Sequence, residues 1–474
     1  MVKAIEIFQS EREKLFDKLA AKLETAYNLN RKIVSFQANK EEPIYRWFKY
    51  KEGFSSALVK YFLSEYSKKT GNILDPFSGA GTSLFAAQEL GWKSYGIELL
   101  PVGTFVIQTR QALNRIDVSK LRAIAKNIWV EISKLKEYNN SIKHISITKD
   151  AFSNDTEDYI NKYLTYCSNL KDKHLQTILK FAAFTVLEEI SYTRKDGQYL
   201  RWDYRSKRDL SGKPFDKGKI LSFEEAVKSK LNQIIQDLLP NQTISLFEKT
   251  DDTKITKHPV NIIEGSCLEL LPKLESDYFD FIITSPPYCN RYDYTRTYAL
   301  ELVYLGYNNE QVRNLRQSML SCTVENKEKV EYLKHFYTSI SKSKTFEKVI
   351  NVYNSSSAMA EVNSILDELN KLGKLNNNNI ARMVKNYFLE LCFVIYEMAR
   401  VTKSDGYCVM VNDNVRYGGE EIPVDLILAE FAENFGFHIK KIFVLPKGKG
   451  NSSQQMGNYG RTEVRKCVYL WQKI

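Results

Sequence analysis

A short apolar segment that ends in a glycine turn and leads into a helical pattern restricts the fold of this chain more than any other feature. Residues 72–74 form the apolar run, and a Gly-x-Gly turn follows at Gly79 and Gly81. A helical pattern then extends over residues 84–90. Glycine permits a sharp turn and the close approach of a ligand, and open α/β sheets bind ligands at the carboxyl ends of their strands. The segment therefore predicts an α/β fold with a ligand site at this turn.

Further short apolar runs predict the rest of the sheet. They occur at residues 94–97, 261–263, 279–284 and 407–411, each bounded by turn residues or charges. Runs of this length and composition are typical of strands that helices cover on both faces. Because such strands are characteristic of parallel sheets, we expect a mostly parallel α/β core.

The predicted strands divide the chain into a core and additional regions. We expect a helical arm at residues 1–42, ended by Pro43, because apolar residues recur there at helical spacing. The core is assigned to three segments, residues 43–110, 255–306 and 386–474. Two largely helical inserts separate them, residues 111–254 and 307–385. Two polar stretches are expected to be loops, residues 192–219 and 376–379.

Charge and composition limit the partners of the chain. Its 474 residues carry a formal net charge of +11, which suits a polyanionic partner because neutralised phosphates release counterions. No run reaches the roughly 18 apolar residues that a membrane helix needs, and the first residues lack an apolar signal-peptide core. We therefore expect a cytoplasmic protein without membrane contact.

The cysteines and histidines give no pattern of a metal site. The chain has seven cysteines and five histidines, which are scattered and include no Cys-x-x-Cys pair. We therefore expect no metal site and no disulfide framework.

Two segments carry a resemblance to a known family. The strand predicted at residues 279–284 leads directly into Ser285-Pro286-Pro287-Tyr288, where the two prolines stop the strand and stiffen the turn. This turn resembles motif IV of the DNA amino-methyltransferases, and Asp75-Pro76-Phe77-Ser78-Gly79-Ala80-Gly81-Thr82 resembles their motif I. The resemblance implies a Rossmann-like, S-adenosylmethionine-dependent methyltransferase core with a mostly parallel seven-stranded sheet. It also implies a role in a bacterial restriction–modification system.

The residue types of the Ser-Pro-Pro-Tyr turn suit methylation of a base amino group. The lone pair of an exocyclic amino nitrogen is delocalised into the ring, and hydrogen bonds accepted from the amino hydrogens can localise it. The Ser285 hydroxyl and the Pro286 carbonyl are the predicted acceptors, and Tyr288 offers a face on which a flipped base can stack. The cofactor sulfonium supplies the leaving group, so no metal is needed. The predicted catalytic residues are Ser285, Pro286, Pro287 and Tyr288.

The resemblance also assigns residues to S-adenosylmethionine. Glu98, at the end of the second strand, is expected to accept hydrogen bonds from the ribose hydroxyls. Residues 45–55 resemble motif X, which packs on the methionine moiety. Ser266 stands where the family often has an aspartate near the adenine amino group, and serine can still accept that hydrogen bond. The predicted cofactor residues are Phe54, Ser55, Asp75, Pro76, Phe77, Gly79, Gly81, Thr82, Glu98 and Ser266.

The first insert, residues 111–254, is the predicted target-recognition region, because it contains a basic stretch. Residues 192–219 hold nine Lys/Arg against four Asp, with aromatic side chains between them. Basic groups can hold phosphates while aromatic and polar groups meet bases. The resemblance implies that the partner is double-stranded DNA. A solvated surface loop is the other interpretation of this stretch. Residues 307–380 are the rival region, and residues 447–455 are a third patch that could contact DNA. The predicted nucleic-acid contacts are Asn290, Arg291, Arg194, Arg201, Arg205 and Lys449.

The first residue of the catalytic turn bears on the target atom. In the family that the chain resembles, serine at this position is most typical of cytosine-N4 enzymes, whereas adenine-N6 enzymes more often carry Asp or Asn. Cytosine N4 is therefore the predicted target and adenine N6 the first alternative. RNA methylation at guanine N2 and an inactive cofactor-binding DNA-recognition protein are further alternatives. We expect any cognate restriction endonuclease to be a separate chain.

Overall fold

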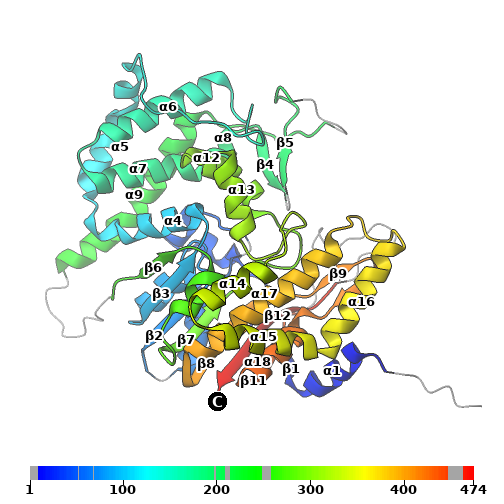
Figure 1. Ribbon diagram of the computed structural model, residues 1–474. Coiled ribbons are helices and arrows are strands. Elements are labelled where there is room, and N and C mark those ends of the chain that lie inside the picture. Colours follow the sequence, from blue (N-terminus) through cyan, green and yellow to red (C-terminus); the bar gives the residue numbers. More distant parts are fainter. Residues whose placement is uncertain are drawn as a thin grey trace, which may run out of the picture.

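The computed structural model describes residues 9–51, 53–67, 69–196, 199–208, 214–247, 258–446 and 463–474. A central sheet of eight strands runs through the lower half of the molecule in Figure 1. In spatial order its strands are β1 (Leu23–Thr25), β11 (Phe437–Val444), β12 (Lys466–Lys473), β8 (Thr402–Asp413), β7 (Phe279–Thr284), β2 (Asn72–Asp75), β3 (Lys93–Glu98) and β6 (Asn261–Glu264). Of these eight, β12 alone is antiparallel to its neighbours. The expected mostly parallel α/β core is confirmed, with one strand more than the seven expected.

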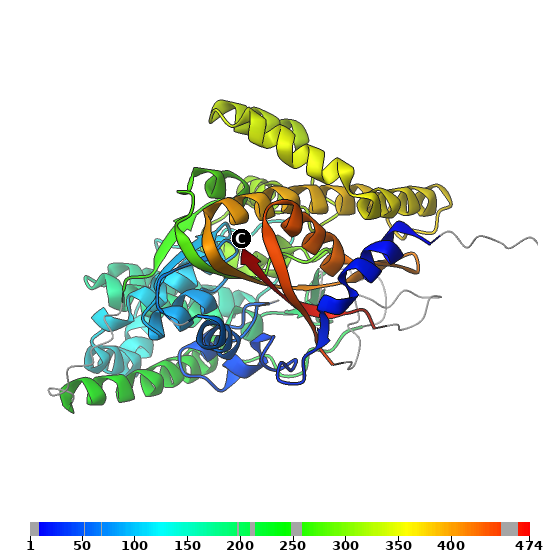
Figure 2. The same cartoon turned by 90° about the horizontal axis from the view of Figure 1, so that it is seen from below.

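The additional strand comes from the N-terminal region, for which a helical arm was the expectation. α1 (Glu11–Leu19) is helical, but β1 then pairs in parallel with β11. The Ala26 N–H continues this ladder by donating to the Val444 carbonyl at 3.0 Å. In Figure 2 the blue α1 lies beside the orange and red C-terminal elements. The helical prediction was wrong for residues 23–35. Residues 23–25 pair with a distant sheet edge, which overrides local periodicity, and residues 26–35 form turns and irregular structure.

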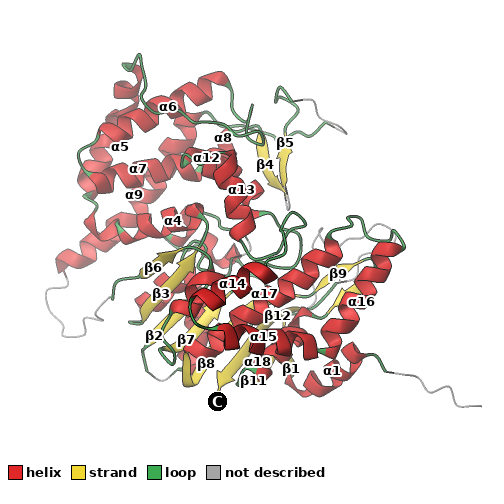
Figure 3. Cartoon of the chain, in the orientation of Figure 1, coloured by secondary structure: helices red, strands yellow, loops and turns green. Residues whose placement is uncertain are grey.

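Helices cover both faces of the sheet, as Figure 3 shows. Successive side chains of a strand point to opposite faces. Phe281 of β7 therefore packs with α2 (Ser56–Tyr66) and α3 (Thr82–Glu89) on one face. Its neighbour Ile282 packs on the other face, in the core that α17 (Ile380–Val401) and α18 (Val424–Asn434) share. This two-sided cover explains why the strands appear in the sequence as continuous apolar runs.

The first insert forms a helical bundle above the sheet in Figure 1. Its helices are α5 (Val118–Ser133), α6 (Asn154–Asn169), α7 (Lys173–Thr185), α8 (Leu187–Ile190) and α9 (Phe223–Phe247). They enclose an apolar core of their own, which also includes side chains of α4 (Pro101–Gln111) and α12 (Ala299–Tyr304). The insert is thus joined to the sheet region through α4 and α12.

A two-stranded hairpin lies in the polar stretch that was expected to be a loop. β4 (Thr193–Asp196) pairs in antiparallel fashion with β5 (Tyr199–Trp202). Thr193 and Leu200 are buried, while Arg194 and Arg201 are exposed. The sequence here has too few apolar residues to display strand alternation, so the loop prediction was wrong for these eight residues.

The second insert is helical but packs closely on the core. Its helices are α13 (Asn309–Ser318), α14 (Val330–Ser339), α15 (Ser343–Ser355) and α16 (Ser357–Lys371). Val349 of α15 and Val362 of α16 belong to the same buried cluster as α17 and α18. α17 begins at Ile380, so a single helix crosses the boundary predicted at residue 386. Residues 376–379 form the expected turn just before it.

Short elements complete the chain. The short helices are α10 (Cys267–Leu270) and α11 (Tyr294–Thr297), and a second small hairpin is formed by β9 (Val415–Tyr417) and β10 (Glu420–Ile422). Single 3-10 turns occur at Ala20–Lys22, Phe36–Lys40, Tyr45–Trp47, Leu113–Arg115 and Leu271–Lys273. Within the described ranges, no helix combines the length and the apolar character needed to cross a membrane.

Candidate active site

A pocket lies at the carboxyl ends of β2, β3 and β7, where the sequence places its ligand turn. It brings together segments that are far apart in the chain. Eight of the predicted cofactor residues line it, namely Phe54, Asp75, Pro76, Phe77, Gly79, Thr82, Glu98 and Ser266. Ser285 and Pro287 of the predicted catalytic turn line the same pocket. The two segments that resemble family motifs therefore face one cavity.

Asp75 connects the glycine loop to the catalytic turn. Its Oδ1 accepts hydrogen bonds from the Phe77 N–H at 3.0 Å and from the Thr284 hydroxyl at 2.7 Å. Its Oδ2 accepts a hydrogen bond from the Ser83 hydroxyl. Burial raises the pKa of Asp75 to about 6, although the Ser83 and Thr284 hydroxyls oppose this shift. Because Thr284 directly precedes Ser285, this carboxylate fixes the distance between the loop and the turn.

Glu98 shapes the glycine loop from the other side. Its Oε2 accepts a hydrogen bond from the Gly79 N–H at 2.6 Å, and its Oε1 accepts one from the Leu100 N–H at 2.7 Å. Gly79 has a φ of +52°, a conformation that favours glycine. Burial raises the pKa of Glu98 to about 8, and the two backbone N–H groups lower it in part. Each carboxylate oxygen has a second lone pair, so Glu98 can hold the loop and still accept a ligand hydroxyl.

The raised pKa of Glu98 predicts a pH-dependent stability. The pKa of Glu98 is about 8 in the folded protein, above the ordinary glutamate value of 4.5, so the folded protein keeps a proton that the unfolded chain releases. The contribution of protonated Glu98 to the free energy of unfolding is fully present below about pH 4.5. It is lost as the pH rises through 8. We expect the free energy of unfolding to fall across this window by up to about 1.4 kcal/mol per pH unit from this group.

Urea unfolding at several pH values checks this expectation. In the Glu98→Gln variant the side chain does not titrate, so the decline in unfolding free energy between pH 5 and 8 should be shallower than in the wild type. The other titrating groups are present in both proteins, so the difference between the two slopes reports on Glu98 and on its coupling to Asp75. Equal slopes in the two proteins would contradict the assignment of the shift to Glu98.

Four predicted residues do not line the pocket: Ser55, Gly81, Pro286 and Tyr288. The Ser55 hydroxyl donates to the Ile33 carbonyl at 2.6 Å and caps α2 through the Leu58 N–H at 3.4 Å. Ser55 is fully buried, so the prediction of a direct cofactor contact is not matched by its position. Gly81, with a φ of +73°, is the N-cap of α3 and supports the loop from behind.

The catalytic turn is compact. The Ser285 hydroxyl donates to the Tyr288 hydroxyl at 3.3 Å. Tyr288 is 7% exposed, so little of its ring face is open to a stacked base in this conformation. The Tyr417 hydroxyl of β9 donates to the Cys289 carbonyl at 2.6 Å and holds the next residue of the chain. The turn therefore presents Ser285 to the pocket, while Tyr288 lies behind it.

The sequence did not single out several residues of the pocket wall. They are Phe36 from the N-terminal region, Tyr50 and Lys51 from the motif X-like segment, Tyr294 after the catalytic turn, and Ser318, Met319 and Leu320 from the second insert. Tyr50 and Lys51 lie within the recognised stretch 45–55 and were within reach of sequence reasoning. The others reach the pocket through tertiary packing. The Ser266 hydroxyl, for example, donates to the Ser318 carbonyl at 3.2 Å and joins the core to the second insert.

The predicted nucleic-acid contacts occupy several places. Arg194 and Arg201 are exposed on the β4–β5 hairpin, and the Arg201 guanidinium lies 4.0 Å from the centre of the Phe215 ring. Arg205 is bound internally, because its Nε and Nη2 donate to both carboxylate oxygens of Asp203 at 2.6 and 2.9 Å. Arg291 Nη1 donates to Asn376 Oδ1 at 2.9 Å, and Asn290 Oδ1 accepts the Tyr292 N–H at 3.2 Å. Lys449 lies outside the described residues.

Among the residues that the structure describes, no group of three or more His, Cys, Asp or Glu side chains is arranged to hold a metal ion. All seven cysteines are buried, and none forms a disulfide. The polar residues of the pocket supply hydroxyls, carboxylates, backbone amides and the amine of Lys51, which suit an organic ligand with several polar groups.

Comparisons with known proteins identify the family. A family model described as DNA methylase matches residues 3–102. The type II methyltransferase M.AvaI of Nostoc sp. is 46% identical over 451 residues, which span 94% of this chain and 90% of that protein. M.BsoBI of Geobacillus stearothermophilus is 41% identical over 487 residues, which span 98% and 92% of the two chains. No solved structure matches the chain. The chain therefore belongs to the type II DNA methyltransferases, the N6/N4 amino-methyltransferases of restriction–modification systems.

Proposed function

We propose that this chain is a site-specific cytosine-N4 DNA methyltransferase that uses S-adenosylmethionine, acts on a base turned out of the duplex, and protects DNA from an endonuclease on a separate chain. One observation carries the proposal. Ser285 and Pro287 lie in the wall of the same pocket as the glycine loop at residues 75–82. A base amino group that meets Ser285 there lies next to whatever ligand the loop holds.

The pocket suits S-adenosylmethionine. The loop lacks a side chain at Gly79, so a ligand can approach its backbone closely. Glu98 at the end of β3 is placed to accept ribose hydroxyls. Phe54 and Phe77 provide apolar wall. The bound cofactor would supply a methyl group that its positively charged sulfonium makes transferable.

The proposed cofactor contacts are thus the eight residues of the predicted set that line the pocket. Asp75 is assigned a double role, because its side chain lines the pocket and also ties the loop to Thr284. Ser55 and Gly81 are assigned to the support of the surrounding backbone. Ser266 lines the pocket from the N-cap of α10, and its hydroxyl donates to the Ser318 carbonyl, which leaves its oxygen able to accept a hydrogen bond.

The catalytic turn provides acceptors for amino hydrogens. The Ser285 hydroxyl and the Pro286 carbonyl would accept these hydrogens, localise the nitrogen lone pair and turn it toward the methyl donor. Tyr288 orients the Ser285 side chain through the contact between their hydroxyls. Serine at this position, rather than Asp or Asn, favours cytosine N4 as the target atom.

Nucleoside analysis of methylated DNA tests the proposed target. The purified protein is incubated with plasmid DNA and isotopically labelled cofactor, and the digested nucleosides are separated by mass spectrometry. Label in N4-methylcytosine supports the proposal, whereas label in N6-methyladenine establishes the first alternative. A parallel reaction with total RNA detects guanine-N2 methylation, and no label in any product would favour an inactive DNA-recognition protein.

We assign DNA contact to the exposed face of the β4–β5 hairpin. Arg194 and Arg201 project from its two strands, and Tyr204 just beyond β5 is 55% exposed. β5 contacts α11, which follows the catalytic turn, so the hairpin lies on the side of the pocket where DNA must approach. Cationic side chains on such a hairpin can bind phosphates while an exposed aromatic ring meets a base.

Charge removal on the hairpin should weaken DNA binding in a salt-dependent way. We expect the double variant Arg194→Gln/Arg201→Gln to reduce the slope of log K against log salt by about 1 to 2, since each lost phosphate contact contributes about 0.9. The rate at saturating DNA should stay near that of the wild type. Fluorescence anisotropy at several salt concentrations measures the slope. The matched control Lys134→Gln/Lys371→Gln removes two exposed charges elsewhere and should leave it unchanged.

A further inference from the structure

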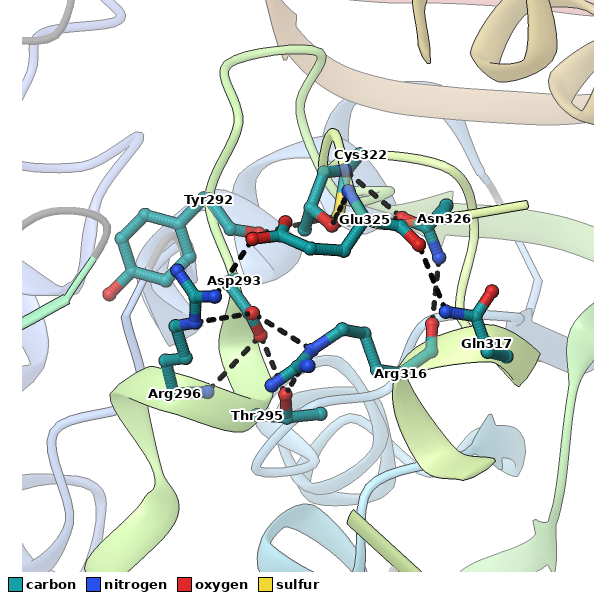
Figure 4. Close-up of polar contacts among 10 residues, drawn as sticks. Tyr292, Asp293, Thr295, Arg296, Arg316, Gln317, Cys322, Glu325 and Asn326 are labelled. Atoms are coloured by element: carbon teal, nitrogen blue, oxygen red, sulfur yellow. Dashed lines mark hydrogen bonds and ion pairs between the residues drawn. The ribbon is translucent and has the colours of Figure 1, made fainter. Parts of the chain in front are cut away.

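A buried acid after the catalytic turn joins two regions that are distant in the sequence. Asp293 is 2% exposed and begins α11. Its Oδ1 accepts hydrogen bonds from the Thr295 hydroxyl at 2.7 Å and from the Arg296 N–H at 3.1 Å. Its Oδ2 lies 2.9 Å from Nε of Arg316, in the last turn of α13 of the second insert. Figure 4 shows this carboxylate between the two arginines.

The second insert is bound to the catalytic loop at several further points around Asp293. Arg316 Nε also donates to the Thr295 hydroxyl oxygen at 3.0 Å. Arg296 Nη2 pairs with Glu325 Oε1 at 2.8 Å, and the Cys322 thiol donates to the Tyr292 carbonyl at 3.3 Å. All of these contacts appear in Figure 4. We call residues 316–326 the bridging segment. It begins in the last turn of α13, and its side chains contact the loop that follows Tyr288.

The bridging segment is also part of the pocket wall. Its residues Ser318, Met319 and Leu320 line the pocket, and the Ser318 carbonyl accepts the Ser266 hydroxyl. The next residue, Ser321, donates its N–H to Glu390 of α17 at 2.8 Å. Lys329 neutralises this buried Glu390 at 2.9 Å. The segment is therefore held on one side by the core helix α17 and on the other by Asp293.

The pairing of the two arginines argues against a role in phosphate binding. Arg296 and Arg316 lie near the catalytic turn, where cationic side chains would ordinarily be assigned to DNA. Arg316 is 19% exposed and faces Asp293, while Arg296 is shared between Asp293 and Glu325. A carboxylate next to a guanidinium group offsets its positive charge and occupies its N–H donors. Such an arginine attracts a phosphate only weakly.

We propose that Asp293 is a positioning residue for methyl transfer, which rests on the proposed function of the pocket. Through Arg316 its carboxylate fixes the bridging segment and the loop after Tyr288 as one unit, so that Ser285, Tyr294 and the wall at residues 318–320 keep their relative places. Misplacement of reacting groups by about 1 Å can reduce a rate by about 100-fold. Loss of this ion pair therefore reduces the rate of methyl transfer and leaves DNA affinity in place.

Single-turnover methylation at saturating DNA and cofactor tests this proposal. Asp293→Asn keeps an oxygen that accepts the Arg296 N–H but removes the charge, and Arg316→Met removes the partner. Each variant should be 10- to 100-fold slower than the wild type, with a DNA dissociation constant within about 2-fold. The double variant should be no slower than the slower single variant, because the two groups act as a unit. Arg316→Lys restores a charge near Asp293 and should recover part of the rate.

The controls separate positioning from folding and from DNA binding. Arg313→Met makes the same substitution on the exposed face of α13 and should keep the wild-type rate. Rates are measured well below each variant's melting temperature. If the variants melt earlier but react at the wild-type rate, Asp293 is merely structural and the proposal is wrong. If Arg316→Met weakens DNA binding and lowers the salt slope at an unchanged rate, Arg316 is a phosphate ligand and the proposal is also wrong.

Failure of the proposed function has a different signature. Ser285→Ala removes the proposed acceptor in the pocket without touching the Asp293 network. If Ser285→Ala reacts normally, the assignment of the catalytic turn is wrong whatever the Asp293 variants do. If Ser285→Ala is inactive and the Asp293 variants react normally, the positioning role alone is overturned.

Discussion

Ser285→Ala should lower the single-turnover rate of methylation by about 100- to 1000-fold, the range found when a positioned hydrogen-bonding group is removed from a reacting centre. Ser285 is the side chain of the catalytic turn that lines the pocket and carries an acceptor oxygen. Without that oxygen, the amino nitrogen lone pair stays delocalised into the ring and the base is less firmly oriented. Cofactor affinity, measured by isothermal titration calorimetry, should change by less than about 3-fold, because this residue acts on the base.

Two companion variants sharpen this prediction. Tyr288→Phe removes the hydroxyl that Ser285 contacts at 3.3 Å but keeps the ring, so we expect a loss of no more than about 10-fold, as for one neutral hydrogen bond. Pro286→Ala keeps the backbone carbonyl but frees its orientation. Its loss of methylation rate should be larger than that of Tyr288→Phe and smaller than that of Ser285→Ala. Normal methylation by both Ser285→Ala and Pro286→Ala would contradict the proposed mechanism.

Gly103→Ala should abolish cofactor binding, since it forces the glycine loop out of place. Gly103 lies in the first turn of α4, and a Cβ atom there would overlap the Gly79 carbonyl oxygen. The same Cβ would lie 2.8 Å from Cγ of Glu98. Because Gly79 O is backbone, the clash can be relieved only by moving the loop or the helix. We expect cofactor affinity to fall by more than about 100-fold, and overpacking to destabilise the fold by about 1–3 kcal/mol.

Calorimetric titration with S-adenosylmethionine measures the loss, and thermal unfolding measures the destabilisation. Gln108→Ala makes a substitution to the same residue type on the exposed side of α4 and should leave cofactor affinity unchanged. A Gly103→Ala protein that is folded and binds the cofactor normally would show that the contact between α4 and the loop is not required.

The local elements around the glycine loop could be predicted because neighbouring residues dictate them. The strand at residues 72–74, the turn at Gly79 and the following helix are specified by apolar runs, by glycine and by short-range hydrogen bonds. The stiff turn after residues 279–284 follows from the two prolines. Since parallel strands end at the same edge of a sheet, these local features also placed the loop and the catalytic turn near each other.

The predictions that failed, and two site residues that the fold engages otherwise, depend on contacts that neither periodicity nor a motif reveals. β1 forms because β11 offers an open edge, and the β4–β5 hairpin forms although its strands contain few apolar residues. Ser55 has the chemistry of a ligand contact, yet the Ile33 carbonyl and the start of α2 occupy its hydroxyl. Arg205 has the charge expected of a phosphate ligand, yet Asp203 binds it on both oxygens. β1 and β11 are distant in the sequence, as are Ser55 and Ile33, so local patterns cannot pair them. The β4–β5 pairing and the Arg205–Asp203 pair are local, but no apolar alternation or motif marks them.

The sequence by itself determined the α/β class, the glycine loop with its acid at Glu98, and a rigid Ser-Pro-Pro-Tyr turn at the end of a strand. These follow from local backbone preferences, which each segment carries independently of the rest of the chain. The tertiary structure alone decided how the pocket is closed. Tyr294 and the wall at residues 318–320 meet there because Asp293, Glu390 and Ser266 hold distant segments together. Such contacts depend on which buried charges and hydroxyls find each other in the folded core, and no periodicity or motif encodes them.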